Sequence, residues 1–412
     1  MAIRRSLLKV FAGIVPMTLL NESKSHIQNA SKFESTTIKR DYYKELGVKS
    51  FINAAGAYSV FGGARMREDT INAMRYAASN KVKIKELHNA VGNRIAQLTG
   101  AEAAMVTSGA TASIVLGTAA CMTLGDEKKM RQLPDTYGIR DEIIIQKKHR
   151  YTYDKALTVA GGRLIEVESE AELLNAINKK TAMMFFLMPP QQVDNIIEAK
   201  RYISIANKMK IPCFCDAATT TPPASNIIDG VKQNFDLICY SGGKGLRGPY
   251  SAGLLLGRSD LIDFSKRHSA PNDVSIGRGM KVSAEEYLGM LVALEVALNI
   301  SASDDNIYKR KRFQNIINQI SGIKGIKTRV FESETMTNEL YLDIDWDENI
   351  IKLSRESFVG LLKENSPSIE VRLLLFSHGR IHLSATVMKN NEDIIIGRAI
   401  RKIFLQSLHS SI

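Results

Sequence analysis

From residue 41 onward, short apolar runs alternate with segments whose apolar residues recur at helical spacing. This alternation predicts strands at 103–107, 142–146, 164–167, 181–188, 211–215, 235–240 and 252–256, and helices at 71–78, 84–99, 110–121, 153–160, 170–178 and 197–209. Strands that are apolar throughout, such as 183–188, are typical of a parallel sheet covered on both faces. The pattern therefore predicts an α/β domain built on a large, mainly parallel sheet.

The pattern changes after residue 260. It predicts long helices at 285–300 and 307–320, strands at 328–331, 339–344, 369–376 and 380–384, and a closing helix at 393–408. Strands followed by a closing helix indicate a smaller C-terminal α+β domain. We expect the large domain at 41–290 and the small domain at 291–412.

Composition narrows the class of protein. The chain has 412 residues, of which 44% are hydrophobic and 24% charged, so disorder, collagen and coiled coil are excluded. No apolar stretch reaches the ~20 residues of a membrane-spanning helix. Four cysteines are too few for a disulfide framework, and Cys213, Cys215 and Cys239 are interpreted as small core residues, with no metal site.

The first thirty residues have the layout of a targeting segment. Arg4-Arg5-Ser6-Leu7-Leu8-Lys9 precedes an apolar run at 10–20, which is typical of a signal peptide. The paired arginines resemble a twin-arginine export signal. We therefore expect residues 1–30 to direct the chain to the periplasm or beyond; the alternative is a frayed tail on a cytoplasmic protein.

Polar residues follow four of the apolar strands. Ligands of open parallel sheets bind outside the carboxyl ends of the strands. These ends carry Ser108-Gly109-Ala110-Thr111, His149, Asp216 and Ser241-Gly242-Gly243-Lys244. The first of them opens a helix of small residues, whose free N–H groups and dipole favour a phosphate; an ordinary tight turn is the alternative.

Lys244 and Asp216 suggest a nucleophile and its charged neighbour. A lysine crowded by glycines and partly removed from water loses its proton more readily and can attack an aldehyde. A carboxylate at the end of a buried strand needs a partner, which is a metal, a loop N–H group or a protonated ring nitrogen. A lone His149 is usually structural, but its ring can stack on an aromatic cofactor. Together the four strand ends describe a pyridoxal phosphate site.

Several segments resemble the selenocysteine synthase (seryl-tRNA selenium transferase)-like family. They are Ile52-Asn53-Ala54-Ala55-Gly56, Glu102 to Ala110, Asp216-Ala217-Ala218, Ser241 to Pro249, and Ile276-Gly277-Arg278-Gly279-Met280-Lys281. The resemblance covers roughly residues 42–405. It implies a fold-type-I pyridoxal phosphate-dependent enzyme with the aspartate aminotransferase fold. The end of the chain, from Gly379 through Asp393, also resembles the class V aminotransferases.

The resemblance also implies roles for individual residues. Lys244 would be the Schiff-base lysine and Asp216 the partner of the pyridinium nitrogen. His149 would stack on the ring, and the phosphate would contact Ser108, Gly109, Ala110 and Ser241. Arg380 would hold the substrate carboxylate, with Arg372 as the alternative. The site would be completed in a homodimer or a higher homo-oligomer, where Arg278 would reach the partner's cofactor.

We expect a lyase acting on a small amino acid or an amino-sugar acid by α,β-elimination. An aminotransferase, a racemase and a non-catalytic homologue are the alternatives, because they share the same residues. A tRNA-linked selenium transferase is disfavoured, since family-like sequence begins near Tyr42 and leaves no room for a tRNA-gripping domain. The distribution of charge agrees with this. The chain has a net charge of +12, and its first forty residues carry seven basic and two acidic side chains. The remaining positive charge is scattered along the chain, so no nucleic-acid partner is expected.

Overall fold

A computed structural model describes residues 40–188, 194–333, 337, 339–374 and 379–409. The chain divides into two compact units, Met1–Ser50 and Phe51–Ile412. In the described part of the first unit, Asp41 caps the short helix α2 (Tyr42–Glu45) by accepting a hydrogen bond from the N–H of Lys44. The predicted export signal lies outside the described residues.

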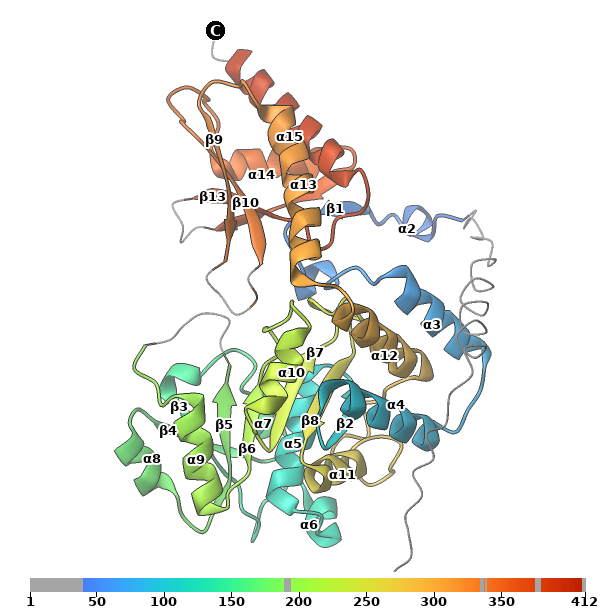
Figure 1. Cartoon of the computed structure of the whole chain (residues 1–412), viewed down its shortest axis with the longest axis vertical. Helices are drawn as coiled ribbons and strands as arrows, with labels where there is room; N and C mark the ends of the chain where they lie inside the picture. Colours follow the sequence, from blue (N-terminus) through green and yellow to red (C-terminus); the bar gives the residue numbers. More distant parts are fainter. Residues whose placement is uncertain (1–39, 189–193, 334–336, 338, 375–378, 410–412) are drawn as a thin grey trace, which may run out of the picture. The chain divides into compact units, whose positions relative to one another are not determined.

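The second unit contains a seven-stranded sheet in the order β2-β8-β7-β6-β5-β3-β4 (Figure 1). Its strands are β2 (Ala103–Thr107), β3 (Glu142–Gln146), β4 (Arg163–Val167), β5 (Thr181–Leu187), β6 (Cys213–Asp216), β7 (Leu237–Ser241) and β8 (Gly253–Gly257). All are parallel except β8, which pairs antiparallel with both β2 and β7. The predicted mainly parallel sheet is therefore confirmed.

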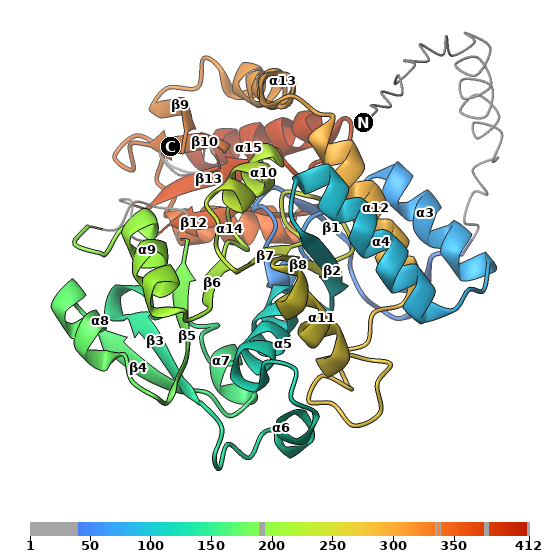
Figure 2. The same cartoon turned by 60° about the horizontal axis from the view of Figure 1, so that its bottom comes forward.

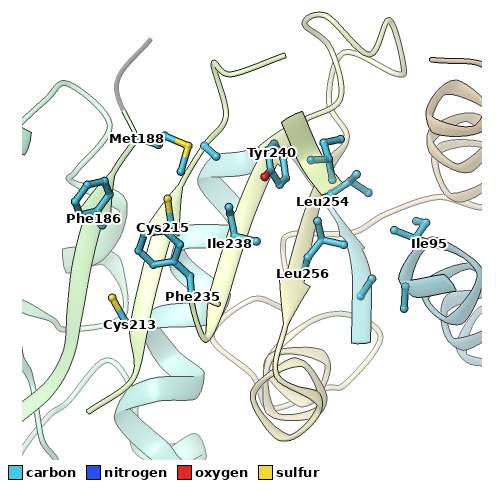
Figure 3. Close-up of a cluster of buried hydrophobic side chains, with 14 of the residues drawn as sticks. Ile95, Phe186, Met188, Cys213, Cys215, Phe235, Ile238, Tyr240, Leu254 and Leu256 are labelled. Atoms are coloured by element: carbon cyan, nitrogen blue, oxygen red, sulfur yellow. The ribbon is translucent and has the colours of Figure 1, made fainter. Parts of the chain in front are cut away.

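Helices cover both faces of this sheet (Figures 1 and 2). One face packs against α4 (Ile84–Thr99), α9 (Ala199–Met209), α10 (Ser225–Lys232) and α12 (Ala284–Leu298). The other packs against α5 (Ala110–Thr123), α7 (Ala156–Val159) and α11 (Ser259–His268). Figure 3 shows the first face, where Cys213 and Cys215 lie among apolar strand residues, as predicted. The remaining helices of this part are α3 (Glu68–Ser79), α6 (Glu127–Gln132) and α8 (Glu170–Ala176).

The C-terminal part consists of a second sheet with helices packed against one face. A four-stranded antiparallel sheet has the order β12-β13-β10-β9, from β9 (Ile326–Glu332), β10 (Leu340–Trp346), β12 (Arg372–Leu374) and β13 (Arg380–Ser384). One of its faces packs against α13 (Ala302–Ile320), α14 (Arg355–Glu364) and α15 (Glu392–His409). The single strand expected at 369–376 is two strands, because β11 (Ser368–Glu370) pairs instead with β1 (Phe51–Asn53).

The change of packing partner falls between α12 and α13. Helix α12 packs against α3 and α4, whereas α13 packs against α15. Residues 291–298, which the sequence pattern assigns to the small domain, therefore pack with the large sheet. Among the described residues no single helix is long and apolar enough to cross a membrane; α12 and α13 meet that test only as a pair, across an 89° bend.

Candidate active site

The predicted strand ends meet at one edge of the large sheet. Strands β2, β3, β6 and β7 run parallel, so their carboxyl ends share that edge, and β8 begins there. Gly253, the first residue of β8, pairs with both Thr107 and Ser241. The segments that begin at Ser108 and Gly242 therefore leave the sheet on either side of one glycine.

Close packing explains the glycines around Lys244. A Cβ at Gly242 would lie 2.8 Å from the carbonyl oxygen of Ala252, one at Gly243 would lie 2.8 Å from Cα of Tyr250, and one at Gly245 would lie 2.2 Å from the nitrogen of Pro222. A larger residue at any of the three would displace backbone. The motif thus holds the turn that carries Lys244 tightly against the strands beside it.

The Lys244 amine is half-buried in this turn. Burial lowers its pKa, and the negative charge of Asp216 offsets part of that shift. A larger fraction of the amine is therefore unprotonated near neutral pH than for an exposed lysine. This is the state that a nucleophile or a general base requires.

Asp216 ends β6 and is 4% exposed. Its Oδ1 accepts a hydrogen bond from the N–H of Ala218 at 2.9 Å and lies 3.7 Å from Sγ of Cys239. Its Oδ2 accepts a hydrogen bond from the hydroxyl of Tyr151. These donors stabilise the carboxylate in an interior where an unpartnered charge would be costly.

Tyr151 is a site residue that sequence reasoning missed. Burial raises the pKa of its phenol, and the neighbouring Asp216 raises it further, so the hydroxyl stays protonated and donates. The available signal was its position, two residues after His149 at the same strand end.

The structure encloses the His149 ring, which is 0% exposed. It meets Phe186 edge-on, with ring centroids 4.5 Å apart, and its Nδ1 accepts a hydrogen bond from the N–H of Leu187. Burial lowers the pKa of His149 to about 4, so the ring is neutral. Stacking of His149 on a cofactor stays a prediction; Tyr151 is the aromatic residue of this segment that reaches Asp216.

The predicted phosphate position is the start of α5. Gly109 precedes this helix with φ of +86°, a conformation that favours glycine, and no side chain caps the first turn. The first N–H groups of the helix therefore have no intrahelical partner. A Cβ at Gly253 would lie 2.5 Å from the carbonyl carbon of Gly109, so a glycine in β8 lets this turn pack closely. Ser241, at the end of β7, is half-buried.

Arg372 and Arg380 share one face of the small sheet. Arg372 pairs with His382, which pairs with Asp343 of β10. Directly opposed residues lie on the same face, and so does Arg380, two residues before His382. Asp343 pairs in turn with Arg329 of β9, a third arginine that the sequence analysis did not consider.

One carboxylate serves this group. Asp343 Oδ2 lies 3.0 Å from Nη2 of Arg329 and 3.8 Å from Nη1 of Arg380, and Oδ1 lies 2.7 Å from Nδ1 of His382. Arg372 has no ion pair among the described residues and lies over the ring of Tyr58, 5.1 Å from its centroid. Two of the three guanidinium groups thus share one aspartate, and the third lies against Tyr58.

Residues 53–64 connect this face to the Lys244 turn. The carbonyl of Ala54 accepts a hydrogen bond from Ser384 of β13 at 2.8 Å, and the N–H of Ala64 donates to the carbonyl of Gly243 at 2.8 Å. Tyr58, between them, contacts Arg372. The arginine face and the nucleophile are therefore linked through one short segment.

Two further expectations concern surface and core residues. Arg278 is half-buried, and its guanidinium lies 3.9 Å from Asp273; its role toward a partner subunit stays a prediction. All four cysteines are buried and unpaired with one another. The described residues contain no group of acidic, histidine and cysteine side chains suited to a metal ion.

The residues present fit a pyridoxal phosphate. The half-buried amine, the hydrogen-bonded carboxylate and the uncapped, glycine-led helix start would bind its aldehyde, ring nitrogen and phosphate. Serine palmitoyltransferase from S. paucimobilis, solved with bound pyridoxal phosphate, shares the fold over 95% of this chain and 98% of its own, with a TM-score of 0.52 and 10% identity. The fold is therefore that of the fold-type-I pyridoxal phosphate-dependent enzymes, as predicted, and two curated enzymes that are similar to nearly the whole chain show that the chain is an enzyme.

Two curated proteins are similar along nearly their whole lengths. D-glucosaminate-6-phosphate ammonia lyase of Salmonella typhimurium is 26% identical over 371 residues, which span 88% of this chain and 97% of the relative. A solved structure of D-glucosaminate-6-phosphate ammonia-lyase superposes with a TM-score of 0.80 over 90% of this chain and 100% of the other, at 25% identity. A 5'-C-glycyluridine monooxygenase-decarboxylase of Streptomyces is 24% identical over 398 residues, 94% of this chain and 97% of that protein. No family model matches the sequence.

Proposed function

We propose that the chain is a pyridoxal phosphate-dependent ammonia-lyase acting on an amino-sugar acid. The observation that carries the proposal is the half-buried Lys244 amine at the same sheet edge as a hydrogen-bonded Asp216, in a chain that matches an ammonia-lyase over nearly its full length. Loss of the α-proton and the β-hydroxyl, followed by hydrolysis, would release ammonia and a 2-keto-3-deoxy acid.

The chain's own residues would divide this work. Bound pyridoxal phosphate supplies the electron sink that stabilises negative charge at the substrate α-carbon. Asp216, held by Tyr151 and Ala218, keeps the proton on the ring nitrogen. Lys244 accepts the α-proton as a general base, which its lowered pKa favours. The N–H groups at the start of α5 hold the phosphate.

The arginine face would bind the anionic parts of the substrate. Arg372 contacts Tyr58 and has no carboxylate partner among the described residues, and its planar guanidinium suits a carboxylate. Arg380 shares Asp343 with Arg329. Three arginines with one aspartate carry a net positive charge, which suits a substrate with two anionic groups, such as a phosphorylated sugar acid.

The proposal also includes a subfamily, an oligomeric state and a location. Placement within the selenocysteine synthase-like family rests on the motifs around Lys244 and Asp216. A homodimer rests on that resemblance, and export rests on the paired arginines Arg4 and Arg5.

The test is product analysis with purified, cofactor-loaded protein. D-glucosaminate, its 6-phosphate and D- and L-serine are supplied separately, and ammonia and keto acid are quantified. We expect both products from an amino-sugar acid, loss of both with Lys244→Ala, and no change with the exposed control Lys155→Ala. Inverted substrate without ammonia would indicate a racemase, and amino transfer to the cofactor would indicate an aminotransferase; either result contradicts the proposal.

A further inference from the structure

A polar cavity lies beside the Lys244 turn. Its volume is about 150 Å³, and its lining includes Gly245 and Arg247 of the turn, Arg67 at the start of α3, Pro222, and the first turn of α13. Gly245, which directly follows Lys244 in the sequence, is therefore part of the cavity lining. The phosphate position at Ser108 to Ala110 is not part of its lining.

Two arginines line this cavity without a carboxylate partner. Arg67 donates from Nη1 to the carbonyl of Leu246 at 2.7 Å, and Arg247 donates from Nε to the carbonyl of Arg65 at 2.9 Å. Among the described residues, no carboxylate oxygen lies within ion-pair distance of either guanidinium. Burial, with repulsion from Arg67 and Arg65, lowers the pKa of Arg247 to about 10.

The acidic side chains nearby are otherwise engaged. Asp305 lies 2.7 Å from Nζ of Lys309, and Glu339 lies 2.9 Å from the same amine. Glu332, which also lines the cavity, is exposed. The negative charge of Asp305 raises the pKa of both arginines, but its carboxylate does not contact either guanidinium. Partly buried charges without such contact are costly unless a ligand pairs them.

Arg247 is also held in an unusual backbone conformation. Its φ is +56°, in the left-handed region where a side chain costs roughly 1 kcal/mol or more relative to glycine. Glycines stand close by at 245 and 248, whereas this position carries a long, charged side chain. Backbone strain at an arginine that lines a cavity points to a role for its guanidinium group.

We propose that Arg67 and Arg247 form a binding site for a phosphate-type dianion, separate from the cofactor. Their free N–H groups match the paired oxygens of such an anion. Inorganic phosphate and the phosphate of a sugar ester share this chemistry. Because the anion would join the start of α3 to the Lys244 turn, it would stabilise the turn that carries the nucleophile.

The experiment measures anion binding to protein saturated with pyridoxal phosphate, so that the α5 position is filled. Inorganic phosphate and D-gluconate 6-phosphate, which lacks the reacting amine, are titrated at matched ionic strength with chloride as reference. Calorimetry and thermal unfolding report binding, since a ligand of the folded state raises the unfolding temperature. Binding does not require turnover, so the result is independent of the proposed lyase activity.

Arg67→Gln and Arg247→Gln are the test variants, and Arg94→Gln, which breaks a surface pair with Glu295, is the control. We expect each test variant to bind the anion about tenfold or more weakly, and the control to match the parent. Binding of the sugar ester but not of inorganic phosphate, lost in both test variants and kept in Arg94→Gln, would support the site and name a sugar phosphate as its source. No binding of either anion beyond chloride, or equal binding by the test variants, would overturn the proposal.

Discussion

Asp216 accepts hydrogen bonds from three donors that differ in kind. Ala218 donates from the backbone, which substitution cannot remove, whereas Tyr151 donates from a hydroxyl and Cys239 from a thiol. The carboxylate is 4% exposed, so water cannot replace a lost donor easily. The charge that faces the ring nitrogen is therefore set by very few atoms, and single substitutions can test it.

Asp216→Asn should keep the cofactor attached to Lys244 but reduce turnover roughly a hundredfold. A neutral amide cannot hold the ring proton, so the α-carbon loses its electron sink. Visible absorbance reports the attached cofactor, and initial rates report turnover. Parental rates in this variant would show that Asp216 serves only to cap the loop at Ala218.

Arg372→Ala should raise KM for the amino acid about thirtyfold or more, while the spectrum of the resting protein stays unchanged. Arg372→Lys should recover little, because a point charge does not reproduce the planar fork. The matched measurement is Arg380→Ala. If Arg380→Ala alone raises KM, the carboxylate binds at Arg380, as the sequence resemblance implies. An unchanged KM in both variants would mean that neither arginine contacts the substrate.

For single residues, the sequence indicated which strands end in polar side chains but not which distant residues those side chains contact. Lys244 and Asp216 stood out because each is a polar residue at the end of an apolar strand. Tyr151 did not, since its role comes from a contact with Asp216 across 65 positions of the chain. Arg329 was missed for a similar reason: it joins the arginine face only through the pairing of β9 with β10.

Close packing against neighbouring backbone fixes the conformation of the Lys244 turn. Gly245→Ala would place a methyl group 2.2 Å from the nitrogen of Pro222. We expect a loss of about 1–3 kcal/mol in the free energy of unfolding, because overpacking forces backbone to move. Denaturant unfolding measures it.

The control for this prediction is Gly279→Ala. Gly279 has nothing within 4 Å of an added Cβ, so the free energy of unfolding should change little. If both variants unfold at the same denaturant concentration as the parent, the glycines of the turn are not required by packing.

Elements were predictable where burial made the pattern continuous. Strands β2 and β3 have the predicted bounds, since buried parallel strands are apolar at every position. The segment at 369–376 looked like one strand because Ile369, Val371 and Leu373 are all apolar. It is two, because β11 pairs with β1 and β12 with β13. Sequence alone does not specify which distant strand is the partner.

For the whole molecule, three buried histidines predict loss of stability in mild acid. Burial lowers the pKa of His88, His149 and His268 to about 4 each. Between pH 6.5 and 4 the unfolded chain binds protons that the folded chain does not, so the free energy of unfolding falls as pH falls. The loss is of order 1–3 kcal/mol per histidine.

Urea unfolding of the cofactor-free protein at pH 7.5, 6 and 5 would measure this effect. His88→Gln should show a shallower dependence than the parent over the same window. An unfolding midpoint that stays constant from pH 7.5 to 5 would contradict the prediction. Carboxylates with lowered pKa values, such as Asp126 and Asp260, act below about pH 4 and leave this window unaffected.

The pairing of β1 with β11 has a consequence for biosynthesis. Residues 51–53 leave the ribosome early, but their partner strand, residues 368–370, follows more than three hundred residues later. The small domain cannot close until almost the entire chain has been translated. Until then Ile52, which is 4% exposed in the final structure, lacks its partner strand. Nascent chains should therefore depend on chaperones for nearly the full time of translation.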